Sequence, residues 1–263
     1  MARFCSLFSS SSGNSVYIGH PNGGILIDIG VSAKRTAEAL NCVGASIESI
    51  GAVFVTHEHC DHIAGVRVFA GKHQTTVYAS QGTLEGMEST GALNGKYPSE
   101  VMPESGVEVN GMFVRAFHTP HDSRESLGYT VEMPDGNRIG IATDIGVVTD
   151  EIMQNLLGCQ LVLLESNHDV RMLQCNPNYP YILKRRILSD HGHLCNEACA
   201  EAAVKLVQSG TTRLLLGHLS KENNMPQLAY QCTNAALSRC GMEEGSDYLL
   251  RVAGVGDPKM IVF

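Results

Sequence analysis

The sequence predicts an α/β protein in which two β-sheets pack face to face and helices cover their outer sides. Strand-like and helix-like patterns alternate along all 263 residues without a linker-like break, so we expect a single domain over residues 1–263. A faint internal echo supports two similar halves, because Leu26–Gly30 resembles Ala142–Gly146. The apolar strand before His57 likewise has a counterpart before His218. Both halves are therefore expected to deliver polar side chains at strand ends.

The first half is predicted to begin with a short β meander, whose turns contain glycine and asparagine. A helix capped by Ser32 follows, and then strands on either side of a histidine-rich loop. We expect strands at Phe4–Phe8, Ser15–Ile18, Gly24–Asp28, Ala52–Thr56 and Thr76–Ala79, and helices at Ser32–Cys42 and Ser80–Glu88.

The second half is predicted to open with strands and then to alternate helices with strands. The turn Pro134–Asn137 joins two of these strands. We expect strands at Phe113–Phe117, Leu127–Glu132, Ile139–Thr143, Leu161–Glu165 and Arg213–Gly217, and helices at Thr149–Leu157, Tyr181–Leu188, Asn196–Gln208 and Pro226–Cys240, before a final strand pair.

Composition is that of a cytoplasmic globular protein. With 43% hydrophobic and 17% charged residues, the chain can bury a substantial core, and no segment reads as membrane-spanning. The stretch Met1–Phe8 is too short for a secretory signal. Nine scattered cysteines without a Cys-x-x-Cys pair indicate neither disulfides nor a zinc ribbon, and most are expected to be small buried hydrophobes. The net charge of −8 argues against a highly basic nucleic-acid binder, although bound cations or a local basic patch can reverse the field at one site.

The run from His57 to His62 is the densest group of metal-binding residues in the chain. It follows the apolar stretch Gly51–Thr56 and places three imidazoles and a carboxylate in one loop. These groups are the nitrogen and oxygen ligands that zinc and other divalent first-row metals prefer, while Glu58 and Cys60 alternate with them. Two ligand pairs within one run imply two metals.

The order of motifs resembles that of the metallo-β-lactamase superfamily, which implies an αββα four-layer sandwich. The motifs are His57-x-His59-x-Asp61-His62, then His121, Asp144 in Thr-Asp-Ile-Gly, and His218 after an apolar strand. Within that superfamily the chain is most similar to the YycJ (WalJ) group of bacterial 5′-to-3′ DNA exonucleases, which are related to the tRNA-processing endonuclease RNase Z. The segments that carry this similarity are Phe8–Ser15, Pro120–Asp122, Glu165–Asp169 and Tyr179–Leu194.

The resemblance also implies a ligand set for two divalent ions, which are Zn, Mn or Fe because His/Asp sites accept each of them. His57, His59 and His121 would hold the first ion, and Asp61, His62 and His218 the second, with Asp144 bridging. A carboxylate can bridge two cations and a neutral imidazole cannot, which agrees with this division. On spacing alone His118 competes with His121, and only the resemblance selects His121. Asp122 is expected to orient His121.

The implied function is a dinuclear-metal-dependent phosphodiesterase, and most specifically a 5′-to-3′ exonuclease acting on duplex DNA ends. Two metals about 3.5–4 Å apart can share one hydroxide that attacks the phosphate. Asp61 is expected to orient this hydroxide besides binding metal. His193 matches the Gly-His of the RNase Z relatives, where it contacts the scissile phosphate, and is expected to assist the departing oxygen.

Other polar residues are candidates for substrate contacts. The densest basic group is expected either to hold backbone phosphates or to form a solvated helix face, and it contains Arg171, Lys184, Arg185 and Arg186. His168 is either a wall of the active site or a structural hydrogen-bonding residue. Ser12 and Asn14 belong to a turn whose backbone N–H groups could face an anion. His20 and His73 are expected on the surface.

Two other functions compete with the nuclease. A small-molecule hydrolase for a thioester, lactone or cyclic phosphodiester would use the same metals, but the basic group and His193 favour a phosphate substrate. A non-catalytic metal-binding regulator would not need an open coordination position, and the presence of all seven ligands argues against it. The chain has no Trp, which leaves no obvious platform for stacking single-stranded bases. The oligomeric state is left open.

Overall fold

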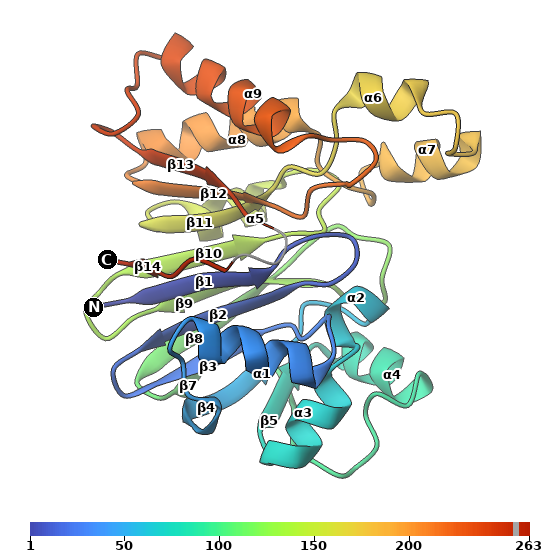
Figure 1. Cartoon of the computed structure of the whole chain (residues 1–263), viewed down its shortest axis with the longest axis vertical. Helices are drawn as coiled ribbons and strands as arrows, with labels where there is room; N and C mark the ends of the chain where they lie inside the picture. The colour runs from blue at the N-terminus through green and yellow to red at the C-terminus, as the bar shows by residue number, and fades with distance from the viewer. Residues whose placement is uncertain (255–257) are drawn as a thin grey trace.

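Two seven-stranded sheets form the centre of the molecule (Figure 1). The computed structural model describes residues 1–254 and 258–263. The first sheet has the order β14-β1-β2-β3-β4-β5-β6, with strands β1 Arg3–Phe8, β2 Ser15–His20, β3 Gly23–Ile27, β4 Ile50–Phe54, β5 Thr76–Ala79, β6 Ser99–Val101 and β14 Ile261–Val262. The second has the order β13-β12-β11-β10-β9-β8-β7, with strands β7 Val107–Val109, β8 Met112–His118, β9 Leu127–Glu132, β10 Arg138–Ala142, β11 Leu161–Glu165, β12 Arg213–Gly217 and β13 Leu249–Val252.

Each sheet contains a run of parallel strands, and these runs determine where the functional residues gather. Strands β3 to β6 are parallel in the first sheet, and strands β10 to β13 are parallel in the second. The carboxyl ends of parallel strands meet at one edge of a sheet, which is where α/β proteins bind their ligands. The loops after β4, β10, β11 and β12 therefore carry the residues of interest.

Helices cover the outer faces of both sheets (Figure 1). Helices α1 to α4 lie on the side of the first sheet, and α8 and α9 lie on the side of the second (Figure 1). Helices α6 and α7 project beside the strand ends (Figure 1). The helices are α1 Ala33–Cys42, a 3₁₀ turn at Ile47–Ser49, α2 Cys60–Ile63, α3 Val66–His73, α4 Gln81–Ser89, α5 Asp150–Leu156, α6 Val170–Cys175, α7 Tyr181–Ile187, α8 Asn196–Gln208 and α9 Pro226–Arg239.

Three apolar clusters hold the layers together. The central one joins the inner faces of the two sheets and includes Phe4, Phe54, Tyr129 and Leu163. A second cluster lies between the first sheet and α1 and α3, and a third between the second sheet and α5, α8 and α9. Each fully buried side chain of this kind contributes about 1.5–3 kcal/mol relative to exposure. The αββα four-layer arrangement predicted from the sequence is confirmed.

Most predicted elements are present, and the exceptions have local causes. The predicted final strand pair is wrong, because β13 pairs with β12 in the second sheet and β14 pairs with β1 in the first. Helix α3 was not predicted, since its two valines and Gly71 are poor helix formers, and burial of Val66, Phe69 and Ala70 stabilises it instead. Strand β6 was missed because it is a three-residue edge strand.

Two predictions about burial are wrong. His20 is buried rather than on the surface, and its Nε2 lies 2.6 Å from the carbonyl oxygen of Asn110. Most of the cysteines are not buried, because among the nine only Cys5, Cys159 and Cys199 are. His73 is half-buried against Phe69, with ring centres 4.9 Å apart.

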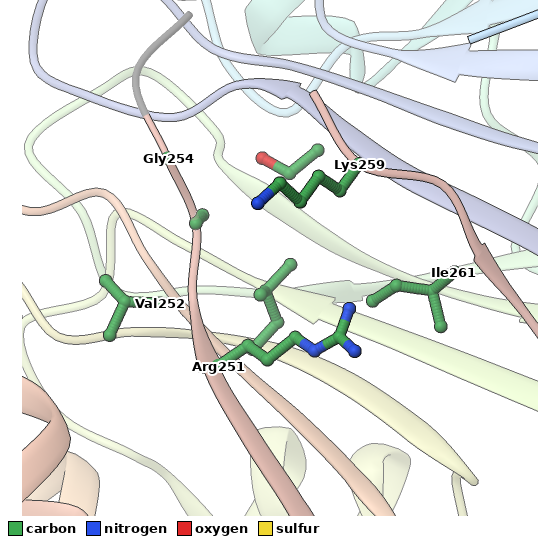
Figure 2. A pocket seen from close by; sticks show the side chains of 8 residues that line it. Arg251, Val252, Gly254, Lys259 and Ile261 are labelled. Carbon is green, nitrogen blue, oxygen red and sulfur yellow. The ribbon is translucent and has the colours of Figure 1, made fainter. Parts of the chain in front are cut away.

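A cavity of about 140 Å³ lies where β13 and β14 approach each other. Figure 2 shows the side chains of Arg251 and Lys259 extending toward it. Ser6 and Leu215 also line it, and it includes none of the predicted metal or substrate residues. This cavity is therefore not the predicted site. Across residues 1–254 and 258–263, no helix is long and apolar enough to span a membrane.

Candidate metal centre

The internal echo in the sequence corresponds to two equivalent strand ends. Asp28 and Asp144 each follow a buried strand with a left-handed backbone, at φ values of 60° and 56°. Two residues later, Gly30 and Gly146 cannot be replaced by a residue with a side chain, because the backbone of another segment passes close to each of them. A Cβ on Gly30 would lie 1.6 Å from the carbonyl oxygen of Asp61, and one on Gly146 would lie 2.2 Å from the backbone of Asp190. These crossings bring the histidine loop and the segment before His193 to the same edge.

The first group of potential ligands contains His57, His59 and His121, as the resemblance implied. One nitrogen from each ring lies within 4.8 Å of the others. Nε2 of His57 is 3.0 Å from Nδ1 of His59, and His57 is fully buried. Nδ1 of His121 lies 3.2 Å from the carbonyl oxygen of Gly192, which leaves Nε2 facing the group.

The second group contains Asp61, His62 and His218, again the set that the resemblance implied. Oδ2 of Asp61 lies 3.6 Å from Nε2 of His62 and 3.8 Å from Nε2 of His218. Both histidines are buried, whereas the Asp61 side chain is 21% exposed. The loop backbone is held by Asn14, whose N–H donates to the carbonyl of Asp61 at 2.8 Å.

Asp144 lies between the two groups. Its Oδ2 is 3.2 Å from Nε2 of His62, and its Oδ1 is 3.8 Å from Nε2 of His121 and 3.4 Å from Nδ1 of His218. It also combines with His57 and His62 in a further possible ligand group. A carboxylate in this position can reach a cation on either side.

Charge and burial at the site fit divalent cations. Oδ2 of Asp144 and Nε2 of His218 are buried without a hydrogen-bond partner among the described residues. Buried polar atoms normally have a hydrogen-bond partner or bind a metal, and unsatisfied ones are costly. Asp28, Asp144 and Glu165 are all nearly inaccessible, so the site concentrates negative charge around imidazoles. The residues present therefore fit a divalent metal site.

The histidines differ in protonation. Burial and the neighbouring His62 lower the pKa of His57 well below its usual range, and burial lowers that of His121. Burial acts in the same direction on His62, but Asp144 and Asp28 raise its pKa by more. Asp144 likewise overcomes burial at His218 and raises its pKa to about 10. In the metal-free protein His62 and His218 therefore hold protons that a metal must displace.

Glu165 is a functional residue that the sequence did not single out. It ends β11, is fully buried, and its Oε1 accepts hydrogen bonds from Nδ1 of His193 at 2.8 Å and Nδ1 of His218 at 2.9 Å. Its Oε2 accepts from the backbone N–H of Ile145 at 2.7 Å. A carboxylate on Nδ1 fixes the imidazole so that Nε2 points at the metal or substrate. Its place after a strand, in line with Asp144, was the one available signal.

Asp28 has the same role in the first half of the chain and was also missed. Its Oδ2 lies 2.8 Å from Nδ1 of His62 and accepts from the hydroxyl of Thr56 at 2.8 Å. Its Oδ1 accepts the backbone N–H of Thr56 at 2.8 Å. The echo with Asp144 was visible in the sequence, but it did not reveal that one aspartate faces the metal positions and the other supports a ligand.

His193 lies beside a cavity of about 170 Å³ that opens next to the metal centre. Its side chain is 23% exposed, and it lies 3.7 Å from Oδ1 of Asp144. Burial lowers the pKa of His193, but the charge of Glu165 raises it by more, to a value above the usual range. The other residues that line the cavity are Ser11, Asp122, Asn167, Tyr179, Leu183, Arg186, Ile187, Gly192 and Ser220.

A buried amide network supports the loops that carry His193 and His218. The side-chain nitrogen of Asn224 donates to the carbonyls of Ser166 and Asn167 at 2.8 and 3.1 Å. The side-chain nitrogen of Asn167 donates in turn to the carbonyl of His218 at 2.9 Å. Such fully bonded polar networks hold one loop arrangement.

The structure decides between the two histidines that competed for the first group. His118 is exposed at the end of β8, and its backbone N–H donates to Glu151 at 3.0 Å. His121 is the residue that enters the site. The expectation that Asp122 orients His121 is not met, because Oδ1 of Asp122 lies 3.3 Å from Nε2, the ring nitrogen that faces the metal positions. The carbonyl of Gly192 holds the other nitrogen.

Two candidates for substrate contact are turned inward. His168 is only 1% exposed, does not line the cavity, and has neither ring nitrogen hydrogen-bonded among the described residues. Its side chain therefore lies apart from the cavity, and a contact with substrate remains a prediction. Asn14 is buried with its amide nitrogen 3.0 Å from Nε2 of His62, so its side chain faces the second ligand group and not solvent. Ser12 stays exposed and accepts a hydrogen bond from Lys221 at 2.8 Å.

The basic group divides into residues with different surroundings. Arg186 pairs with Asp122 and lines the cavity, which places one cation beside the metal centre. Lys184 donates to the carbonyl of Gln174 at 2.7 Å and so joins α7 to α6. Arg185 and Arg171 are exposed. A contact with phosphate remains a prediction for all four.

Comparison with known proteins agrees with this geometry. The family model described as Beta-lactamase superfamily domain matches residues 24–219. The chain is 35% identical to the exodeoxyribonuclease YycJ of Bacillus anthracis, over 98% of this chain and 96% of that one. It is also 35% identical to the exodeoxyribonuclease WalJ of Streptococcus pneumoniae, over 94% and 92% of the two chains. The fold resembles the metallo-β-lactamase fold protein YhfI of Bacillus subtilis, with a TM-score of 0.73 at 12% identity and coverage of 98% and 99%.

Proposed function

Because the chain belongs to the β-lactamase superfamily, we propose that it is a divalent-metal-dependent phosphodiesterase and, within that class, a 5′-to-3′ DNA exonuclease acting at duplex ends. Similarity to exodeoxyribonucleases over nearly the whole chain supports the DNA substrate. The structural observation that carries the proposal is His193, held by a buried carboxylate between Asp144 and an open cavity. This is the position of a group that exchanges a proton with a substrate at the metal centre.

The site is proposed to hold two ions of Zn, Mn or Fe. His57, His59 and His121 would hold one, and Asp61, His62 and His218 the other, with Asp144 shared between them. Bound divalent ions would lower the pKa of a water molecule and offset the charge of the phosphate. The supporting carboxylates of Asp28 and Glu165 fix the ligand rings, which keeps the site in one geometry before substrate arrives.

Two side chains of the site have access to the reacting groups. Asp61 is 21% exposed, compared with 3% for Asp144, so it is the ligand carboxylate able to orient the attacking water. Hydrolysis joins the water oxygen to phosphorus and breaks the bond from phosphorus to the departing oxygen, which must gain a proton. His193 donates that proton from Nε2, because Glu165 occupies its Nδ1 and keeps its pKa high.

The cavity beside His193 favours part of a large substrate over a complete small one. Its volume of about 170 Å³ is below the range of about 300–1,000 Å³ that encloses small ligands. Its lining combines the ion pair of Arg186 and Asp122 with the polar side chains of Ser11, Asn167 and Ser220. These groups suit a phosphate and sugar at the end of a strand that continues over the surface.

The proposal is tested with metal-reconstituted protein on linear duplex DNA labelled at its 5′ or its 3′ end. We expect early release of the 5′ label as a short product, late loss of the 3′ label, and no cleavage of a covalently closed circle. Cleavage of the closed circle would indicate an endonuclease. Hydrolysis of a thioester or lactone without any cleavage of DNA would favour the small-molecule hydrolase and overturn the proposal.

A further inference from the structure

One face of helix α7 belongs to the cavity at the metal centre. Leu183, Arg186 and Ile187 line that cavity together with His193. These positions are spaced i, i+3 and i+4, which places them on one side of a helix. This side of α7 therefore already belongs to the proposed substrate site.

The sides of α7 that do not line the cavity expose large apolar side chains. Tyr181 and Ile182 are 73% and 80% exposed, and Leu188 directly after the helix is 42% exposed. At about 3.6 residues per turn, Tyr181, Arg185 and Leu188 point away from the cavity-lining side. We call Tyr181, Ile182, Arg185 and Leu188 the outer face of α7. Adjacent exposed apolar groups of this size indicate a binding surface.

Positive charge accompanies these apolar groups. The guanidinium of Arg185 lies 6.0 Å from the centre of the Tyr181 ring. Lys184 and Arg186 flank Arg185, so three of the 19 basic residues of a chain with net charge −8 lie consecutively on this helix. An exposed aromatic ring among cations is the combination with which proteins stack nucleobases and hold their phosphates.

We propose that the outer face of α7 meets the end of a DNA duplex, parts the last base pair and stacks on a freed base, so that one strand reaches the cavity on the other side of the helix. This inference rests on the proposed nuclease function. The cavity beside His193, at about 170 Å³, has room for part of one strand and not for a paired duplex end. Opening the last base pair costs free energy, and stacking of a freed base on Tyr181 offsets it.

A second copy of this chain fits the outer face less well than DNA does. In a two-fold symmetric contact the same patch meets itself. The Arg185 cations of the two copies would then lie in one contact, and like charges at a contact repel. The phosphates of DNA attract the same cations.

The test compares two duplexes that differ only at the end, one blunt and fully paired and the other with three mismatched terminal pairs. Full-length, metal-reconstituted protein is used, and the readout is the ratio of the cleavage rates on paired and mismatched ends. In the double variant Tyr181→Ala, Ile182→Ser we expect this ratio to fall about 10-fold, the scale of one lost base stack. Tyr181→Phe keeps the ring, and Val68→Ser removes a 55% exposed apolar group from α3, so both should keep the wild-type ratio.

Equal losses on both duplexes, or no loss on either, would overturn the strand-separating role. A wild-type dimer in sedimentation that the double variant dissociates, with an unchanged ratio, would assign the outer face to a second copy and also overturn it. A wild-type protein that hydrolyses bis(p-nitrophenyl) phosphate but neither duplex would refute the nuclease function itself. Failure of the inference and failure of the function are therefore distinguishable.

Discussion

Replacing Glu165 by Gln tests the central arrangement of the site. The wild-type carboxylate accepts hydrogen bonds from Nδ1 of His193, Nδ1 of His218 and the backbone N–H of Ile145. Gln has the same shape but no charge, and its NH₂ group cannot accept a hydrogen bond. Glu165→Gln therefore leaves at least one buried donor without its acceptor and removes the charge that faces both imidazoles.

The magnitude follows from the pKa of Glu165. Burial raises this pKa, but the charges and hydrogen bonds of His193 and His218 lower it by more, from 4.5 to about 2. At about 1.4 kcal/mol for each tenfold change in proton affinity, the surroundings favour the charged form by about 3 kcal/mol. Since the pKa is lowered on folding, this stabilisation is present above pH 4.5 and is lost as the pH falls toward 2.

We expect Glu165→Gln to reduce the free energy of unfolding of the chelator-treated protein by about 3 kcal/mol near neutral pH, measured by urea denaturation. Its affinity for metal should fall about 10- to 100-fold, the usual cost of losing a residue that orients a ligand. Glu201→Gln, on the exposed side of α8, is the matched control and should stay within about 0.5 kcal/mol. Wild-type stability and metal affinity in Glu165→Gln would refute the role given to this residue.

Four further predictions follow from the same geometry. His193→Ala should keep its metal but cleave DNA about 100-fold more slowly, and loss of metal from this variant would make His193 a ligand. Elemental analysis of reconstituted protein should find about two ions per chain, and one or fewer would contradict a bridging Asp144. Because the pKa values of His62 and His218 are raised, metal affinity should fall about tenfold per pH unit for each displaced proton as the pH decreases below these values, as competition titrations would show. Arg185→Ala should flatten the log–log salt dependence of DNA binding by about 0.9, and an unchanged slope would mean that Arg185 contacts no phosphate.

The potential metal ligands could be predicted from the sequence because they are concentrated in one run of residues and at the ends of predicted strands. A loop with three histidines and an aspartate after a buried strand indicates a metal site in any α/β fold. The carboxyl ends of parallel strands meet at one sheet edge, so Asp144 and His218 could be expected near the histidine loop although they are far from it in the sequence. In each of the two expected ligand groups, one potential ligand atom of every residue lies within 4.8 Å of the others.

The supporting carboxylates could not be predicted in this way. Glu165 is 28 and 53 residues from the histidines that it holds, and Asp28 is 34 residues from His62. The sequence around a single acidic residue at the end of a strand does not show whether its carboxylate binds a metal or holds a histidine that binds one. The choice between His118 and His121 could not be made from the sequence either, because His118 ends β8, His121 follows three residues later, and only the packing of the loop decides which one enters the site.

By itself the sequence determined the layer architecture, most of the strands and helices, and the kinds of ligand at the strand ends, because periodicity and ligand chemistry are local properties. Only the tertiary structure shows that Glu165 and Asp28 hydrogen-bond to His218 and His62 of the second expected ligand group, that His168 and Asn14 turn inward, and that α7 presents one face to the cavity and another to solvent. These outcomes depend on where the strand ends of two packed sheets meet. The positions of these strand ends relative to one another are set by the whole core between the two sheets and not by any single segment of the chain.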